Sequence, residues 1–174
     1  MHDPDPRTLQ RARSGDLGAF EDLVRGSQAE VFRFAVHLTR DHALAEDVTQ
    51  DTFLRAFRFI GGYRGGQRFG SWLFAIARNC AMDALRKRGR IAELPERDVR
   101  VTPDASLRAE LDAALSAISA DHRDAFLLVE VFGLSYQEAA DVLGVAVGTV
   151  KSRMFRARQA LCRAIAGDEE EAAR

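Results

Sequence analysis

The strongest candidate for ligand binding is a run of cationic side chains in residues 149–163, a segment without any acidic residue. Arginine and lysine at this density bind phosphate groups, and a guanidinium group can also read the edge of a base. Val150, Met154 and Leu161 recur between them at helical spacing, so we expect one apolar face and one basic face. The cationic residues are Lys151, Arg153, Arg156, Arg158 and Arg163.

The residues before this segment predict a helix and a tight turn. Ser135 and Glu138 have the spacing of a capping box at a helix N-terminus. An apolar face over residues 139–143 stops at Gly144, a residue that suits the left-handed end of a helix. Residues 135–158 are therefore typical of a helix-turn-helix whose second helix enters the major groove of DNA. The alternative is an ordinary helical hairpin with a solvated basic face.

A second group mixes aromatic and basic side chains in residues 61–90, where two glycine pairs flank Tyr63 and the arginine after it. Aromatic rings can stack on unpaired bases while guanidinium groups hold the backbone, so the pattern suits a single nucleic-acid strand. In the alternative interpretation Tyr63, Phe69 and Trp72 fill the core, and Phe69 and Phe74 fit either role equally well. The other members are Arg64, Arg68, Arg78, Asn79, Arg86, Lys87 and Arg88.

Residues 41–51 hold four acidic side chains and no arginine or lysine. Asp47 and Asp51 lie one helical turn apart, but no histidine or third carboxylate joins them at ligand spacing. One helix face supplies too little geometry for a hard cation, so we predict no metal site. A solvated face or a protein-docking face suits this segment better.

No group of residues predicts catalysis. His37, His42 and His122 have no partner pattern, and Cys80 has no base near it in the sequence. The phosphate-binding pattern GxxxxGK[ST] is also missing from the sequence. We therefore expect neither an enzyme nor a cofactor.

Composition is that of a globular protein, with 47% hydrophobic and 29% charged residues in a chain of 174. No apolar run approaches the ~20 residues of a membrane span, and the first 16 residues lack the apolar core of a signal peptide. We therefore expect a cytoplasmic protein without membrane insertion, in which Cys80 and Cys162 are reduced and partly buried. The net charge of −1 conceals segregated acidic and basic runs, which indicate separate surfaces for separate partners.

Hydrophobic periodicity predicts an all-α fold of two small helical domains joined by a flexible linker. The domains are residues 1–89 and 106–166, the linker is 90–105, and an acidic tail, solvated and frayed, follows at 167–174. Leu54 and Phe57 belong to the apolar stripe of the second expected helix. The expected helices are 16–39 with a break allowed at Gly26-Ser27, 42–59, Trp72 to about Arg88 with Ser71 as its cap, 106–118, 121–132 with Asp121 as its cap and Gly133 at its end, 135–143, and 147–165.

Three motifs, in this order and divided by a linker, resemble bacterial RNA polymerase sigma factors of the extracytoplasmic-function group of the sigma-70 family. The resemblance covers about residues 10–165 and implies two helical domains, sigma region two and sigma region four. It also implies a promoter-specificity subunit that binds core RNA polymerase and directs transcription initiation. The motifs are AEDVTQDTFLRAF (45–57), FGSWLFAIARNCAMDALRKR (69–88) and GLSYQEAADVLGVAVGTVKSRMFRARQAL (133–161).

The resemblance assigns three groups of site residues. The first group would dock on the β′ clamp helices of the polymerase, the second would melt and read the minus-ten element, and the third would read the minus-thirty-five element. The docking residues would be Glu46, Asp47, Gln50, Asp51 and Phe53. The minus-ten residues would be Arg55, Tyr63, Arg64, Arg68, Trp72, Arg78, Asn79, Arg86 and Arg88. The minus-thirty-five residues would be Thr149, Lys151, Ser152, Arg153, Phe155, Arg156 and Arg158.

Within these groups the sequence departs from the family in two places. Gly65 and Gly66 stand in the base-capturing loop where relatives often carry an acidic or small polar residue, which leaves the preferred base open. Lys151 replaces a frequent arginine, and a lysine discriminates between bases less sharply than a bidentate guanidinium. Phe155 fits either a thymine methyl contact or core packing, and Arg158 fits a phosphate contact better than a base contact.

The resemblance further implies the β flap of the polymerase as a second contact and regulation by an anti-sigma factor. No sigma region three fits in the linker, and no inhibitory extension precedes residue 10. The main alternative is a free-standing transcription regulator that binds duplex DNA through residues 135–158 alone. A sigma mimic that titrates an anti-sigma factor is a further alternative, although such a mimic should have lost the basic residues Lys151, Arg153 and Arg156.

Overall fold

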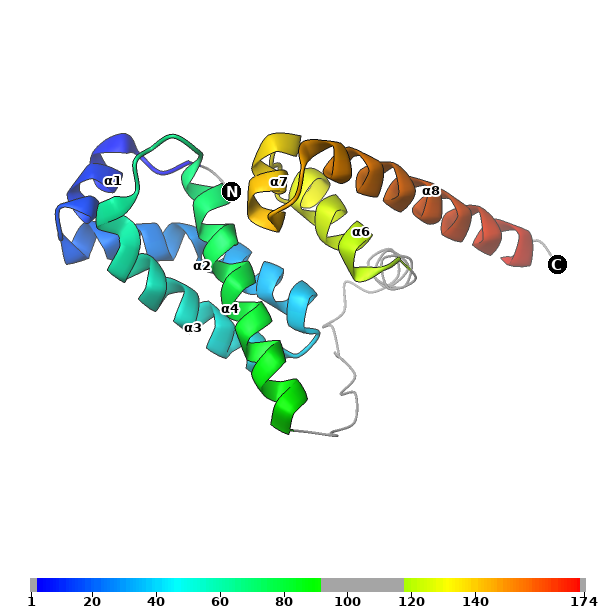
Figure 1. Cartoon of the computed structure of the whole chain (residues 1–174), viewed down its shortest axis with the longest axis horizontal. Helices are drawn as coiled ribbons and strands as arrows, with labels where there is room; N and C mark the ends of the chain where they lie inside the picture. Colours follow the sequence, from blue (N-terminus) through cyan, green and yellow to red (C-terminus); the bar gives the residue numbers. More distant parts are fainter. Residues whose placement is uncertain (1–2, 92–117, 173–174) are drawn as a thin grey trace. The chain divides into compact units, whose positions relative to one another are not determined.

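The computed structural model describes residues 3–91 and 118–172. In these two ranges the chain is helical without any strand, which confirms the all-α prediction. The predicted linker 90–105 begins two residues too early, since residues 90 and 91 belong to the last helix of the first unit. The rest of the linker and residues 106–117 of the predicted helix 106–118 lie outside the described residues. The chain divides into two compact units, Met1–Val99 and Arg100–Arg174, and each is described by itself (Figure 1).

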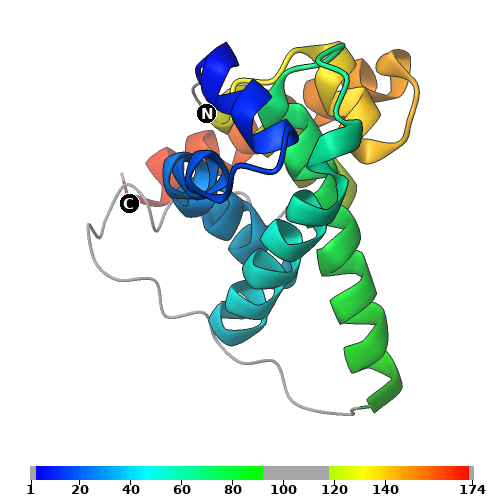
Figure 2. The ribbon, with the colours of Figure 1, turned by 90° about the vertical axis from the view of Figure 1, so that its left-hand side faces the viewer.

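The first unit consists of α1 (Pro6–Arg13), α2 (Leu17–Thr39), α3 (His42–Phe59), the 3₁₀ turn η1 (Ile60–Gly62) and α4 (Phe69–Ile91). Helices α2, α3 and α4 pack on one another around a core in which the rings of Phe34 and Phe74 meet edge to face at 5.0 Å (Figures 1 and 2). Asp16 and Asp41 cap α2 and α3 by accepting hydrogen bonds from backbone N–H groups of the first turn. Because one face of each helix is buried in this core, the opposite faces of α3 and α4 are exposed to solvent.

The structure differs from the sequence interpretation of this unit at three places. Helix α2 runs through Gly26-Ser27 without the break that the sequence allowed, and the Ser27 hydroxyl donates to the Leu23 carbonyl inside the helix. Helix α4 begins at Phe69, so Ser71 is buried in its first turn and does not cap it. Helix α1 was not predicted, although Asp5 caps it and Pro6 occupies its first position.

The second unit consists of α6 (Ala120–Phe126), a π-helical turn η2 (Leu127–Val131), α7 (Tyr136–Leu143) and α8 (Val147–Ala172). The predicted capping box is confirmed, since Ser135 accepts from the Glu138 N–H at 3.2 Å and Glu138 accepts from the Ser135 N–H at 2.8 Å. Gly144 ends α7 in the left-handed conformation with φ of 68°. The apolar side chains of α8 predicted to face inward are all buried, namely Val150, Met154 and Leu161.

Other predictions for the second unit need correction. Ser119 precedes α6, and Asp121 lies exposed in the first turn of that helix and does not cap it. Helix α8 continues to Ala172, so most of the tail that was expected to fray is helical. Cys162 is exposed, while Cys80 is buried as a free thiol. Burial raises the pKa of the Cys80 thiol, which keeps it protonated and unreactive.

Candidate nucleic-acid and protein-docking sites

Helix α8 presents one continuous face away from the core of its unit. We call Lys151, Ser152, Phe155 and Arg156 the basic face, because they are all exposed and follow one another at helical spacing. Phe155 is 62% exposed, which answers the sequence-level question of whether it packs in the core. Within the described residues Lys151 and Arg156 form no ion pair, so both charges are available to an incoming anion.

The other two arginines assigned to minus-thirty-five DNA are each paired with a carboxylate of the same unit. Arg153 donates from Nη2 to Asp121 Oδ2 of α6 at 2.6 Å, and its side chain is only 17% exposed. Arg158 donates to Glu130 of η2, and this hydrogen bond raises the pKa of the guanidinium. The four arginines and lysines assigned to minus-thirty-five DNA therefore divide into two free cations and two that tie α8 to its neighbours.

The two hydroxyl side chains assigned to minus-thirty-five DNA, Thr149 and Ser152, are less available to DNA than the sequence indicates. Thr149 is half-buried at the start of α8. Its carbonyl accepts a hydrogen bond from the Ser152 hydroxyl at 2.9 Å, so this hydroxyl is already engaged within the helix. A phosphate contact at this end of α8 would therefore draw on backbone N–H groups of the first turn.

The loop between η1 and α4 is closed over an aromatic cluster. Tyr63 is 6% exposed, and its ring lies 5.3 Å from that of Trp72 and 6.0 Å from that of Phe69. The Tyr63 hydroxyl donates to the Gln67 carbonyl within the loop, and burial raises its pKa. Phe69 and Phe74 are both buried, as the core interpretation required, so only Trp72 of this set is partly open to solvent.

Most of the basic side chains assigned to minus-ten DNA already hold a carboxylate. Arg55 and Arg86 share Asp83, at 3.1 Å and 2.8 Å, and this pairing raises the pKa of Arg55. The remaining two pairs are Arg88 with Asp41 at 2.8 Å and Arg68 with Asp3 at 3.0 Å. These partners lie 28 to 65 residues away in the sequence, apart from the Asp83–Arg86 pair within α4.

Three assigned residues of this group differ from the paired arginines. Arg64 and Asn79 are exposed, Arg64 on the loop and Asn79 on α4. Arg78 is half-buried, and its Nε atom is buried with no hydrogen-bond partner among the described residues. Arg64 and Asn79 are therefore exposed polar side chains of this group that form no ion pair within the described residues.

The outer face of α3 carries the acidic residues. We call Glu46, Asp47, Gln50, Asp51, Leu54 and Phe57 the acidic stripe, since all are exposed at helical spacing. The carboxylates of this stripe form no ion pair within the described ranges, while Phe53 is half-buried beside them.

Two members of the acidic stripe were placed wrongly from the sequence. Leu54 and Phe57 were expected in the core, but they are 58% and 42% exposed. The Phe57 ring meets the Phe20 ring edge to face, with the two centroids 5.1 Å apart. The signal for their exposure was their spacing from Asp47 and Asp51, which continues the polar face. An acidic face with an apolar end suits a basic protein surface that also offers apolar groups.

Among the described residues no group of three histidine, cysteine, aspartate or glutamate side chains could hold a metal ion. Across the same residues, no helix is both long enough and apolar enough to cross a membrane.

Two family models match the chain. The model "Sigma-70 region 2" covers residues 23–91, and "Sigma-70, region 4" covers residues 108–161. The first match contains α3, the loop and α4, and the second contains α6, α7 and the basic face of α8. The two surfaces described above therefore fall in two different matched regions.

Curated relatives match over most of this chain. It is 40% identical over 163 residues to the ECF RNA polymerase sigma factor SigE of Mycolicibacterium smegmatis, covering 85% of this chain and 63% of SigE. It is 36% identical to the RNA polymerase sigma-H factor of Pseudomonas aeruginosa, covering 92% of this chain and 93% of the relative. It is 37% identical to the RNA polymerase sigma factor CarQ of Myxococcus xanthus, covering 95% and 100%. The chain thus spans less than two thirds of SigE but nearly all of the other two.

Solved structures match as well. The sigma factor RpoE in complex with the anti-sigma factor NepR, from Bartonella quintana, has a TM-score of 0.74 at 33% identity and covers 84% of this chain and 96% of RpoE. The structure of CnrH in complex with the cytosolic domain of CnrY has a TM-score of 0.71 at 28% identity and covers 92% and 96%.

Proposed function

The chain belongs to the sigma-70 family of RNA polymerase sigma factors, in its extracytoplasmic-function group, and from this premise we propose that it is a promoter-specificity subunit. It binds core RNA polymerase and directs transcription initiation at promoters with two recognition elements. The observation that carries the proposal is the pair of exposed helix faces of opposite charge, the acidic stripe in one matched region and the basic face in the other.

The acidic stripe is the docking surface for core polymerase. Its carboxylates are exposed and unpaired within the described residues, so a basic helix surface such as the β′ clamp helices loses little by binding them. Leu54 and Phe57 at the end of the stripe supply apolar area, which is where interfaces gain most of their stability. A second contact, to the β flap, belongs to the region-four unit.

The basic face reads the minus-thirty-five element. Lys151 and Arg156 are free to meet base edges or phosphates, and the exposed Phe155 ring can pack on a thymine methyl group. Arg153 and Arg158 serve mainly to hold α8 against α6 and η2, so their contribution to DNA binding is indirect. The domain 1–89 would then bind core polymerase and the minus-ten element, and the domain 106–166 would bind the minus-thirty-five element.

The aromatic loop reads the minus-ten strand after the duplex opens. Arg64 and Asn79 are exposed for the first contacts, while the Tyr63 ring must leave its cluster before it can stack on a base. Taking a base out of its stack costs a few kcal/mol, which the loop must return by stacking and hydrogen bonding.

Control in trans follows from the same family. RpoE and CnrH are each held in a complex in the solved structures, RpoE by an anti-sigma factor and CnrH by the cytosolic domain of CnrY. We propose that an anti-sigma factor binds this chain and holds it inactive. We also propose that this chain acts in the cytoplasm and is not an enzyme. Its partners would therefore be core polymerase, promoter DNA and that inhibitor.

Run-off transcription with purified core polymerase on a library of genomic fragments tests the proposal. We expect transcripts that depend on the chain and share an upstream and a downstream motif. A chain that gives no transcripts and no complex with core polymerase on gel filtration, but still binds duplex DNA, would be a free-standing helix-turn-helix regulator.

A further inference from the structure

Helix α1 and the segment before it contact the two ends of the loop between η1 and α4, although they lie outside the region-two match. Helix α1 packs on η1, and a Cβ atom on Gly61 would lie 3.8 Å from the Arg13 carbonyl oxygen. At the other end of the loop, Arg68 donates from Nε to Asp3 Oδ2 at 3.0 Å. The N-terminal residues therefore touch the loop where it begins and where it ends.

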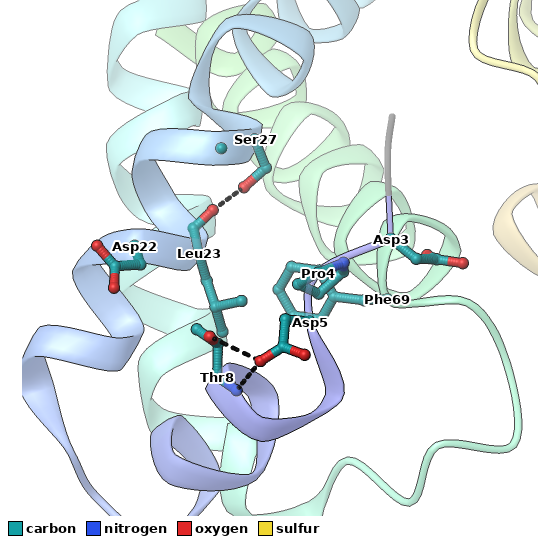
Figure 3. Close-up of a pocket in the computed structure, with 9 residues that line it drawn as sticks. Asp3, Pro4, Asp5, Thr8, Asp22, Leu23, Ser27 and Phe69 are labelled. Carbon is teal, nitrogen blue, oxygen red and sulfur yellow. Dashed lines mark hydrogen bonds between the residues drawn. The ribbon is translucent and has the colours of Figure 1, made fainter.

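The segment Asp3–Asp5 is not packed tightly on α2. A pocket of about 290 Å³ is lined by Asp3, Pro4 and Asp5 of the segment, by Leu23 and Gly26 of α2, and by Phe69 (Figure 3). Between this segment and the loop lies the Asp3–Arg68 ion pair, and the Phe69 ring lines the same pocket as Asp3 and Pro4 (Figure 3).

Phe69 connects this segment to the aromatic cluster. Its ring lies 5.6 Å from that of Trp72 and 6.0 Å from that of Tyr63. Asp3 is also close enough for its charge to raise the pKa of the Tyr63 hydroxyl, after the larger effect of burial. A displacement of Asp3 would therefore release Arg68 and change the surroundings of the Phe69, Tyr63 and Trp72 rings.

We infer that Asp3 is a positioning residue of the loop: by holding Arg68 it keeps the loop closed over Tyr63 until a nucleic-acid strand displaces it. The inference rests on the proposed function only for the identity of the strand. Closure reduces the apparent affinity for the strand in proportion to the fraction of open loop. Because the two side chains are 40% and 50% exposed, the tie is weak enough to be exchanged for a phosphate contact.

Trp72 gives a direct readout of closure, since it is the only tryptophan of the chain and packs against the Tyr63 ring in the cluster. We expect the acrylamide quenching constant of its fluorescence to rise about two-fold in Asp3→Asn at low salt, as the loss of a modest surface ion pair allows. The difference should vanish near 1 M salt, where the screening length is about 3 Å. Asp3→Glu should restore the quenching of the unaltered chain.

Asp22→Asn is the matched control. Asp22 lines the same pocket and also pairs with an arginine, Arg25 at 3.3 Å, but that partner is on α2 and not on the loop. Equal quenching in Asp3→Asn and the unaltered chain, or an equal rise in Asp22→Asn, would overturn the inference.

A second measurement separates the tie from the proposed function. Holoenzyme with Asp3→Asn should bind a single-stranded minus-ten oligonucleotide about two- to five-fold more tightly than holoenzyme with the unaltered chain. Weaker binding would overturn the inference that closure opposes strand capture. If quenching rises while oligonucleotide binding stays the same, the tie stands and the assignment of the loop as the minus-ten reader fails.

Discussion

The two basic regions of the chain differ in what their cations already hold. On α8, Lys151 and Arg156 are exposed and form no ion pair with the described residues, while Arg153 and Arg158 hold Asp121 and Glu130. In the first unit, by contrast, Arg55, Arg86 and Arg88 are each bound to a carboxylate of the same unit. In the proposed function the exposed cations of the basic face would therefore bind duplex DNA directly, whereas the paired arginines of the first unit would exchange partners before they bind an opened strand.

This difference fits the order in which the two elements are used. Duplex DNA presents its phosphates and base edges at once, so a preformed face gains speed from long-range attraction. A separated strand appears only after the duplex melts. Arginines that are already paired with carboxylates attract duplex DNA of any sequence less strongly before that point. Four substitutions test the charged side chains of the two regions.

Asp51→Arg should have the largest effect, because it reverses a charge in the middle of the acidic stripe. We expect affinity for core polymerase to fall by about 2–4 kcal/mol, as like charges would meet across the interface. The helical circular dichroism and melting temperature should stay unchanged because Asp51 is exposed.

Glu21→Arg provides the control, since Glu21 is an exposed acid of α2 outside the stripe. Equal losses for both variants in a core-binding titration would show that net charge, and not the stripe, governs docking.

Arg156→Ala tests the preformed basic face. Binding of holoenzyme to a cognate upstream element should weaken by about 1–3 kcal/mol if Arg156 reads a base. Arg158→Ala, whose guanidinium is already bound to Glu130, should weaken binding less. Competition between cognate and altered elements is the measurement, and an equal loss on every sequence would make Arg156 a phosphate contact.

Helix existence was largely predictable from the sequence, whereas the state of the charged side chains was not. The periodicity of α3 and α8 and the Ser135–Glu138 box depend on residues within one or two turns, where sequence patterns are informative. The Arg55–Asp83 and Arg153–Asp121 pairs join residues 28 and 32 positions apart, which only the fold brings together. Helix α1 was missed because its eight residues contain only Leu9 and Ala12 as apolar signals.

Asp83→Asn tests the paired arginines. Removing this carboxylate frees Arg55 and Arg86, so affinity for single-stranded DNA at low salt should rise about two- to five-fold, the equivalent of an exposed ion pair. The gain should shrink as salt increases. Weaker binding instead would mean that Asp83 orients Arg55 toward the strand and does not compete with it.

The smallest effect is expected at Asp41, where substitution should change how the stability of the first unit depends on acid. The hydrogen bond from the Leu44 N–H, followed by the contact with Arg88, holds the pKa of Asp41 below its ordinary value of 3.8. Its stabilisation is therefore fully present above pH 3.8 and is lost as the pH falls below that value.

Asp41→Asn keeps a good helix cap but removes this titration, so the melting temperature should fall less steeply with acid than in the unaltered chain. The measurement is thermal unfolding followed by circular dichroism from pH 6 to about pH 3, the range around the ordinary carboxyl pKa. Identical slopes for the two proteins would show that Asp41 contributes nothing to the acid dependence.

The central claim is that the acidic stripe binds the polymerase while the basic face selects the DNA. Run-off transcription from one cognate template, titrated with chain at fixed core polymerase and limiting template, separates these jobs in a single measurement. We expect Asp51→Arg to shift the titration to higher concentration but to reach the plateau of the unaltered chain, whereas Arg156→Ala should saturate at the usual concentration with a lower plateau. The same shift for both variants, or no transcript with the unaltered chain, would contradict it.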